Sequence, residues 1–145
     1  MIWDRLKYFK KTENWGDPNR VSGLLLLTMD SIRDIVNTPI HINSAYREND
    51  KSPNGNLSQH ALGTACDFYI FNLPFELACE KLLNSLNVLQ IIDRVGLGAY
   101  PCWNTKGFHL DIRGTRARWG CIGEEYVGFD EAIKYYYAHN KKSNS

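Results

Sequence analysis

The chain is organised around the stretch Ser58-Gln-His-Ala-Leu-Gly-Thr-Ala-Cys-Asp67, which places an imidazole and a carboxylate on either side of a glycine. Gly63 allows the loop between His60 and Asp67 to turn sharply, a conformation that residues with side chains resist. A second stretch, Gly107-Phe-His-Leu-Asp-Ile-Arg113, has the clearest alternation of apolar and polar residues in the chain. This alternation predicts a half-buried β-strand with one apolar face and one polar face.

The polar face of this second strand carries His109 and Asp111, because alternate residues of a strand share a face. The segment 65–71 alternates as well, with Asp67 on its polar face. Two strands that meet in one sheet could bring His109 to the point where His60 and Asp67 lie. Two imidazoles, one carboxylate and a position left for water are what a catalytic zinc site needs. The alternative is that each is an ordinary surface residue or a hydrogen-bonded core residue.

The remaining patterns predict an α+β fold, in which helices pack on one face of a mainly antiparallel sheet and a zinc cleft lies on the other face. One domain is expected over 1–145, with an N-terminal arm over 1–20 and a frayed polar tail over 140–145. The expected elements are a helix over 21–36, a strand over 40–47, a loop over 48–57, a strand over 65–71, a helix from Pro74, strands over 94–100 and 107–113, a loop over 114–127 and a helix over 130–139.

Composition and charge exclude several classes of protein. The 145 residues have a formal net charge of +1, so no global field attracts a polyanion, and we expect no nucleic-acid partner. The longest apolar run, Leu24 to Leu27, is far too short to cross a bilayer. The first residues contain no apolar core of a signal peptide, so we expect synthesis in the cytoplasm. No two cysteines have the Cys-x-x-Cys spacing of a thiolate zinc site.

The signature Ser58-x-His60-x-x-Gly63-x-Ala65-x-Asp67 resembles the S-x-H-x-x-G-x-A-x-D motif of zinc D-Ala-D-Ala carboxypeptidases and of bacteriophage L-alanyl-D-glutamate endolysins. That family shares a fold with the hedgehog signalling domain. Ser44-Ala-Tyr-Arg47 is similar to the family's S-G-Y-R turn, with alanine in place of glycine. Gly98-Ala-Tyr-Pro101 and Phe108-His-Leu-Asp-Ile-Arg113 are similar to its G-x-Y-P and F-V-H-x-D-x-R stretches. The motifs occur in the family's order over about residues 20 to 114.

The resemblance implies a zinc-dependent peptidase that hydrolyses the stem peptides of peptidoglycan, as a carboxypeptidase or as an endolysin-type endopeptidase. It implies that Arg47 contacts a carbonyl or carboxylate of the substrate, and that Tyr100 belongs to the substrate-binding residues. Ser58, also assigned to substrate binding, would support the histidine loop, because metal ligands need outer partners that fix their orientation. The residues that the resemblance assigns to one zinc ion per chain are His60, Asp67 and His109.

The general base is the point at which this sequence departs from the family. Several relatives have an acidic residue three positions before the last histidine ligand, and Lys106 stands there in this chain. Asp111 is the expected substitute, because it projects from the same face of its strand as that histidine. Its alternative role is a partner of the histidine or of Arg113. The next candidates for the base are Glu48 and Asp50.

The missing acid also supports a second function, a catalytically silent cell-wall-binding or phage structural module with the same fold. For an active enzyme, the absence of a signal peptide fits an endolysin that acts on the wall after release through a membrane lesion, or a component carried in a virion.

Overall fold

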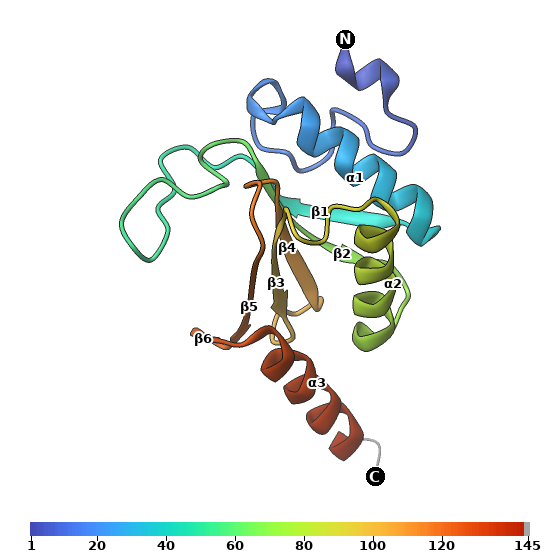
Figure 1. The fold of residues 1–145 in the computed structure, drawn as a ribbon, viewed down its shortest axis with the longest axis vertical. Helices are drawn as coiled ribbons and strands as arrows, with labels where there is room; N and C mark the ends of the chain where they lie inside the picture. Colours follow the sequence, from blue (N-terminus) through green and yellow to red (C-terminus); the bar gives the residue numbers. More distant parts are fainter. Residues whose placement is uncertain (144–145) are drawn as a thin grey trace.

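Six strands form one mainly antiparallel sheet in the computed structural model, and three α-helices accompany them in the described part of the chain (Figure 1). The described part is residues 1–143, apart from the side chains of residue 137 and residues 139–143. The α+β prediction is thereby confirmed. In chain order the elements are α1 (Gly23–Val36), β1 (Ile40–Ser44), β2 (Ala65–Ile70), α2 (Phe75–Val88), β3 (Gly96–Tyr100), β4 (Gly107–Asp111), β5 (Ala117–Ile122), β6 (Glu125–Val127) and α3 (Phe129–Ser143).

Strand β4 lies in the interior of the sheet, in the order β1-β2-β4-β3-β5-β6. It pairs antiparallel with β2, which places Asp67 directly opposite His109, and antiparallel with β3, which places Gly98 on the other side of His109. The pairing of β3 with β5 is parallel. The chain therefore brings the two expected ligand strands into direct contact, although 42 positions separate the two residues.

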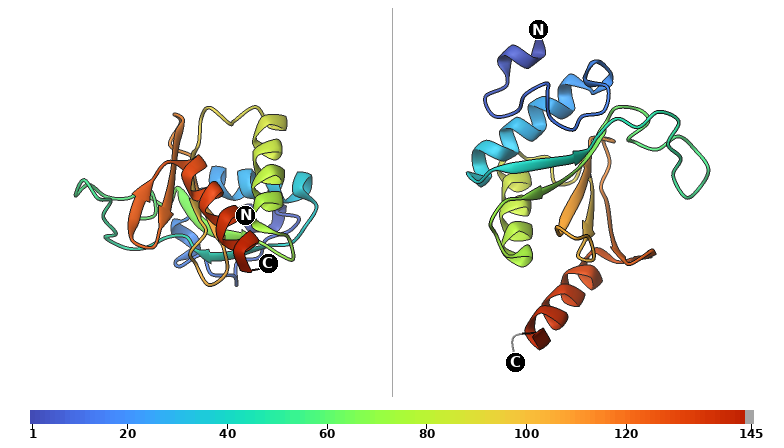
Figure 2. Two further views of the ribbon diagram at one scale, coloured as in Figure 1. Left: turned by 90° about the horizontal axis from the view of Figure 1, so that it is seen from below. Right: turned by 180° about the vertical axis from the view of Figure 1, so that it is seen from behind.

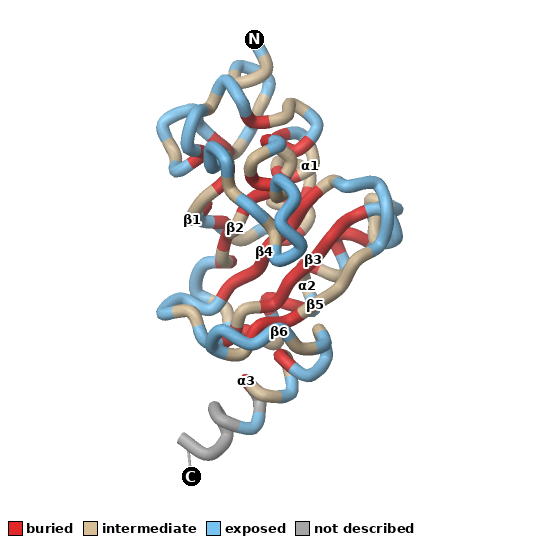
Figure 3. The backbone as a smooth tube through the Cα atoms, turned by 90° about the vertical axis from the view of Figure 1, so that its left-hand side faces the viewer, coloured by how far each residue is buried: buried red, intermediate tan, exposed pale blue. Residues whose placement is uncertain are grey.

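The hydrophobic core lies between the sheet and the helices. Phe68 and Leu110, which come from the apolar faces of β2 and β4, are fully buried, as are Leu25 and Met29 of α1. Figure 1 shows α2 on one side of the strands and the long loop between β1 and β2 on the other. Figure 2 shows α1 and α3 at opposite ends of the sheet. The middle strands β3 and β4 are mostly buried (Figure 3).

The N-terminal arm is attached to the body by its aromatic residues. Trp15 is completely buried and meets the rings of Trp3 and Phe9 edge-on, each at 5.6 Å between centroids. Its carbonyl oxygen accepts a hydrogen bond of 2.9 Å from the amide of Tyr46. The arm therefore fixes the segment that immediately precedes Arg47.

Strand β1 is shorter than the sequence pattern predicted, and this changes the position of Arg47. The strand ends at Ser44, and its register shifts between Ile42 and Ser44. The reason is tertiary, because the Tyr46 amide bonds to the arm instead of to a neighbouring strand. Arg47 therefore extends from the loop after the strand, and the expectation of a strand that continues to residue 47 was wrong.

The segment expected as a loop over 114–127 contains two strands, so that prediction was wrong. Strand β5 pairs in parallel with β3, which precedes it by some twenty residues, and then turns back into β6. Alternation is weak in β5, and Gly120 is enclosed because a side chain there would lie 2.4 Å from Ala132 of α3. Pairing with β3 and packing under α3 therefore determine this strand more than its local pattern does.

The helix boundaries differ from the predictions by a few residues. Pro74 precedes α2 as its N-cap, whereas the sequence placed it in the first turn. The last helix, expected to end at 139, continues to Ser143, so it includes the first four positions of the expected tail. Residues 144–145 of that expected tail lie outside the described residues. No described helix combines the length and the apolarity that crossing a bilayer requires.

Candidate metal centre

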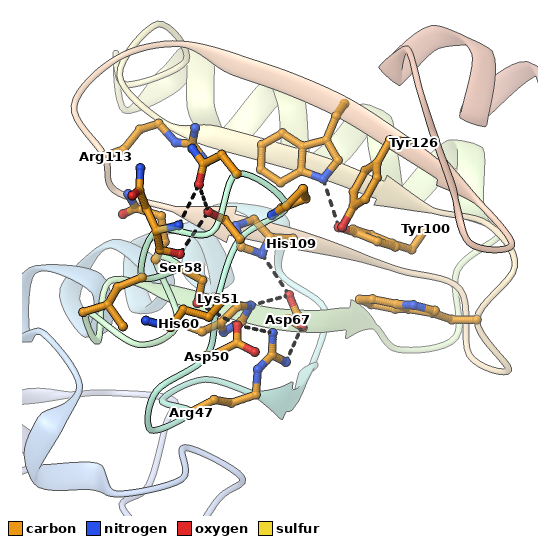
Figure 4. Close-up of a pocket in the computed structure, with 18 residues that line it drawn as sticks. Arg47, Asp50, Lys51, Ser58, His60, Asp67, Tyr100, His109, Arg113 and Tyr126 are labelled. Atoms are coloured by element: carbon orange, nitrogen blue, oxygen red, sulfur yellow. Dashed lines mark hydrogen bonds and ion pairs between the residues drawn. The ribbon is translucent and has the colours of Figure 1, made fainter.

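His60, Asp67 and His109 meet on the side of the sheet that the helices leave open (Figure 4). Their ligand atoms all lie within 4.8 Å of one another. Oδ1 of Asp67 is 3.2 Å from Nε2 of His60 and 3.0 Å from Nδ1 of His109. Both histidines are buried, at 3% and 7% exposure. The sequence-predicted ligands are therefore together in the folded chain.

The turn that carries His60 is held in place from both ends. The Ser58 hydroxyl accepts a hydrogen bond of 3.2 Å from the amide of Ala61. At the other end, the carbonyl of Gly63 accepts one of 2.8 Å from the amide of Ser22, which caps α1. Gly63 has a φ of +76°, and a Cβ there would lie 2.0 Å from a backbone oxygen of Arg20. Glycine is therefore required where the turn packs against the start of α1.

The nitrogen of each histidine that faces away from Asp67 has its own hydrogen-bond acceptor. Nδ1 of His60 lies 2.6 Å from the carbonyl oxygen of Ala45, and Nε2 of His109 lies 2.8 Å from Oδ2 of Asp111. In a neutral imidazole, a proton on one nitrogen leaves the other with a lone pair. When both histidines are neutral, these outer acceptors therefore direct one nitrogen lone pair of each toward Asp67. The arrangement resembles metal sites, where an outer oxygen fixes the tautomer of each histidine ligand.

This donor set can hold a metal ion. Two imidazole nitrogens and one carboxylate oxygen converge, and their burial excludes most competing solvent. Divalent transition metals accept such a mixed set of nitrogen and oxygen ligands. The residues therefore fit the metal site that the sequence predicted.

The charges of the cluster shift the titration of its members. Burial raises the pKa of Asp67, but hydrogen bonds and positive charge from His109 and His60 outweigh it, so the pKa lies well below its usual range. Burial lowers the pKa of His109, but hydrogen bonds to Asp111 and Asp67 outweigh it, and the net pKa is raised. Without a metal the cluster therefore favours an ionised carboxylate beside a protonated imidazole.

Asp111 lies behind His109 and does not line the cavity in front of the ligands. It is fully buried, and both of its oxygens accept hydrogen bonds of 2.7 Å from the guanidinium of Arg113. Burial opposes ionisation, but hydrogen bonds from Arg113 and His109 hold the pKa of Asp111 well below its usual range. This geometry matches the alternative role, a partner of His109 and Arg113, better than that of a general base.

Arg47 reaches the cluster from the loop after β1. Its Nη1 is 3.3 Å from Oδ2 of Asp67 and 3.3 Å from the hydroxyl of Ser44, and its Nη2 is 3.4 Å from Asp50. Asp50 also accepts a hydrogen bond of 2.6 Å from Ser58. That hydrogen bond, together with the charge of Arg47, lowers the pKa of Asp50. Arg47 and Ser58 thus support the ligand cluster from the side of the loop.

A cavity of about 830 Å³ opens in front of the ligands. One wall is aromatic, because the rings of Tyr100 and Trp103 stack at 4.3 Å with an angle of 15° between them. The loop after β1 forms the opposite wall, where Lys51 extends into solvent. Tyr100, which the resemblance assigned to substrate binding, lines the cavity, and Trp103 is a wall residue that the sequence analysis missed.

Trp119 is the most important residue that the sequence analysis did not assign to the site. Its ring lies 5.0 Å from that of His109, and its Nε1 donates a hydrogen bond of 2.9 Å to the hydroxyl of Tyr100. Gly98 makes room for it, because a Cβ there would lie 2.6 Å from Nε1 of Trp119. A glycine in an otherwise buried strand, as at Gly98, is the signal that could have indicated such a close approach.

Lys106 and the base candidate Glu48 both lie apart from the ligand cluster. Lys106, at the position where relatives have an acid, extends over the ring of Tyr136 at 5.6 Å and does not line the cavity. Glu48 is exposed and does not line the cavity either.

Comparison with known proteins adds no relative: no protein-family model, no curated protein and no solved structure matches the chain.

Proposed function

We propose that this chain is a zinc-dependent peptidase that hydrolyses the stem peptides of peptidoglycan, with the fold of the hedgehog-like metallopeptidases. The observation that carries the proposal is the convergence of His60, Asp67 and His109 at the base of an open cavity. His60 and Asp67 occupy fixed positions of the family's signature, and His109 stands in the stretch similar to F-V-H-x-D-x-R. The four motifs that resemble the family follow in its order.

Zinc is the metal that best suits this donor set. Three protein ligands of nitrogen and oxygen type, with one open position, are the usual arrangement of a catalytic zinc ion. A bound zinc ion would polarise the scissile carbonyl and lower the pKa of its water to about 7. The outer acceptors, Ala45 and Asp111, hold the two imidazoles in the orientation that metal binding requires.

Arg47 is the proposed anchor for a carboxylate of the substrate. Its guanidinium lines the cavity next to Asp67 and is about 42% exposed, so a substrate can reach it. A guanidinium matches a carboxylate with two parallel hydrogen bonds, which a lysine ammonium does not. Stem peptides carry such carboxylates.

A second candidate function has its own structural support. Asp50 and Asp111 each accept hydrogen bonds from an arginine, and Lys106 extends away from the cavity. The cavity therefore lacks an obvious unpaired carboxylate among these candidates for the base. A catalytically silent module that binds the cell wall through the same cavity would lack such a carboxylate.

The test of the proposed function is mass spectrometry of defined muropeptides incubated with the zinc-loaded protein. A peptidase yields fragments whose combined mass exceeds the parent by one water, and His60→Ala yields none. His41→Ala is the matched control, because His41 is exposed on β1 and stacks on Tyr69 outside the ligand cluster. Intact muropeptides that nevertheless bind the zinc-loaded protein would favour the silent module, and the fragments would identify the bond that an active enzyme cleaves.

A further inference from the structure

The hydroxyl of Tyr100 has an unused proton. The indole nitrogen of Trp119 can only donate a hydrogen bond, so Tyr100 must be the acceptor in their contact of 2.9 Å. Within the described residues, the Tyr100 hydroxyl donates to no protein acceptor. Trp119 occupies one side of the hydroxyl oxygen of Tyr100, so the O–H bond of Tyr100 points in another direction. Tyr100 also lines the cavity (Figure 4).

The ring of Tyr100 is held firmly enough to orient that proton. Trp103 stacks on one face of it at 4.3 Å, and Trp119 fixes the oxygen at the far end. Trp119 itself packs over Gly98, its ring lies 5.0 Å from that of His109, and the guanidinium carbon of Arg113 is 5.3 Å from it. The position of the hydroxyl is thus coupled to the same residues that orient His109.

Most of the charged donors closest to the ligands already have protein acceptors. Arg113 directs two N–H groups to Asp111. Nη1 and Nη2 of Arg47 contact Asp67, Asp50 and Ser44, and its other N–H groups are those that the proposed function assigns to a substrate carboxylate. If an oxygen atom of a molecule bound in the cavity gains negative charge, few hydrogen-bond donors without a protein acceptor are therefore close to it. Tyr100 supplies one from a fixed position on the aromatic wall.

Resting on the proposed function, we infer that the Tyr100 hydroxyl donates a hydrogen bond to the carbonyl oxygen of the bound peptide, and that Trp119 is the residue that positions it. During hydrolysis, water adds to the carbonyl carbon and the C=O electron pair moves to the oxygen. The tyrosine proton stays on Tyr100 and stabilises that growing charge, so no further reactant is needed. A donor aimed at developing charge is worth more in the transition state than in the substrate complex.

The electrostatic surroundings of Tyr100 keep it a donor. Burial raises the pKa of Tyr100 to about 12, only partly offset by the hydrogen bond from Trp119. The phenol therefore stays protonated at neutral pH. It cannot act as a general base there, so it is distinct from the residue that activates water.

The experiment compares the zinc-loaded wild type with Tyr100→Phe. Removing one donor of this kind lowers kcat by about 10²–10³-fold. We expect that loss with KM and zinc affinity nearly unchanged. Tyr69→Phe is the matched control, because it deletes a hydroxyl from the same face of the sheet outside this cavity. Trp119→Phe keeps an aromatic ring over His109 but deletes the N–H, and it should lower kcat by a smaller factor.

A second readout does not depend on turnover. A phosphinate pseudodipeptide presents a tetrahedral, negatively charged oxygen, and calorimetry of the zinc-loaded protein measures its binding. Tyr100→Phe should weaken this binding by about 10- to 100-fold, as expected for loss of a hydrogen bond to a charged group. Its binding of the uncleaved peptide should change less.

The outcomes separate this inference from the proposed function. If the wild type cleaves no wall peptide but binds the phosphinate in a Tyr100-dependent way, the peptidase function fails and the donor role stands. If the wild type turns over peptides and Tyr100→Phe equals it in kcat and phosphinate affinity, the donor role is overturned. A wild type that binds no phosphinate also overturns it.

Discussion

The carboxylate of Asp111 lies 2.8 Å from Nε2 of His109, on the opposite side of the imidazole from the nitrogen that faces Asp67. An outer carboxylate of this kind fixes the tautomer of a ligand histidine and makes the ligand more basic. Because Asp111 is also paired with Arg113 and fully buried, its geometry fits a residue that orients His109 better than one that meets substrate.

Asp111→Asn tests this role. If Asp111 orients His109, the variant should bind zinc about 10- to 100-fold more weakly. A general base would instead contribute about 10²–10⁴-fold to the rate, and its loss would leave zinc affinity intact. Zinc titration and turnover measured on the same variant distinguish the two. Asp93→Asn is the control, since Asp93 pairs with Arg116 on the surface at 79% exposure and should change neither quantity.

Arg47→Lys tests the proposed substrate anchor. The lysine keeps the positive charge near Asp67 but loses the planar fork that binds a carboxylate with two hydrogen bonds. We expect the variant to retain zinc and to lose most of its activity. Arg116→Lys, at an exposed ion pair with Asp93, serves as the reference substitution. Near-normal turnover in Arg47→Lys would show that Arg47 does not anchor the substrate.

The pH dependence of stability follows from the shifted pKa values of the metal-free protein. The raised pKa of His109 contributes stability that is fully present below pH about 6.5 and is lost as the pH rises through the folded-state value. The lowered pKa values of Asp67 and Asp111 contribute stability above pH about 4, which is lost as the pH falls through their folded-state values. Stability should therefore decline on both sides of this window.

Zinc binding should oppose the loss of stability on the high-pH side of this window. A metal ion displaces the proton from a histidine ligand, so binding strengthens as the pH rises. The increase in Tm on adding zinc should therefore be larger at pH about 7.5 than at pH about 5.5. Thermal unfolding with and without zinc at both pH values measures this. A zinc-induced shift that is equal at both would argue against histidine ligation.

Gly63→Ala tests the turn that presents His60. The new methyl group would lie 2.0 Å from a backbone oxygen of Arg20, at a φ of +76°. A side chain forced into such a conformation destabilises by more than about 1 kcal/mol, and the clash adds to this. Gly55→Ala separates the two effects, because Gly55 has a φ of +86° with no atom within 4 Å of an added Cβ. Urea unfolding should show a much larger loss for Gly63→Ala, and equal losses would contradict the packing described.

The ligand cluster could be predicted because local patterns fix its parts. Alternation on β2 and β4 determines that Asp67 and His109 point to the polar face, and neighbouring pairing in the sheet then brings them together. A turn with an obligatory glycine returns His60 to the same point. The direction of each side chain and the turn depend on short stretches of sequence, whereas the pairing of β2 with β4 joins residues 42 positions apart.

The walls of the site could not be predicted in the same way. The loop position of Arg47 depends on a hydrogen bond between Tyr46 and Trp15, which are far apart in sequence. The place of Trp119 depends on the parallel pairing of β5 with β3 and on the space above Gly98. Such long-range contacts have no local pattern of polarity, so Trp119 and Trp103 became visible as site residues only in the folded chain.

The most direct measurement for the central claim is the zinc content of purified protein after loading and removal of free metal, for the wild type, His60→Ala and His41→Ala. The account predicts one zinc ion per chain in the wild type and in His41→Ala, and none in His60→Ala, with unchanged circular dichroism in all three. Wild-type protein without zinc, or a His60→Ala protein that keeps it, would contradict the metal centre formed by His60, Asp67 and His109.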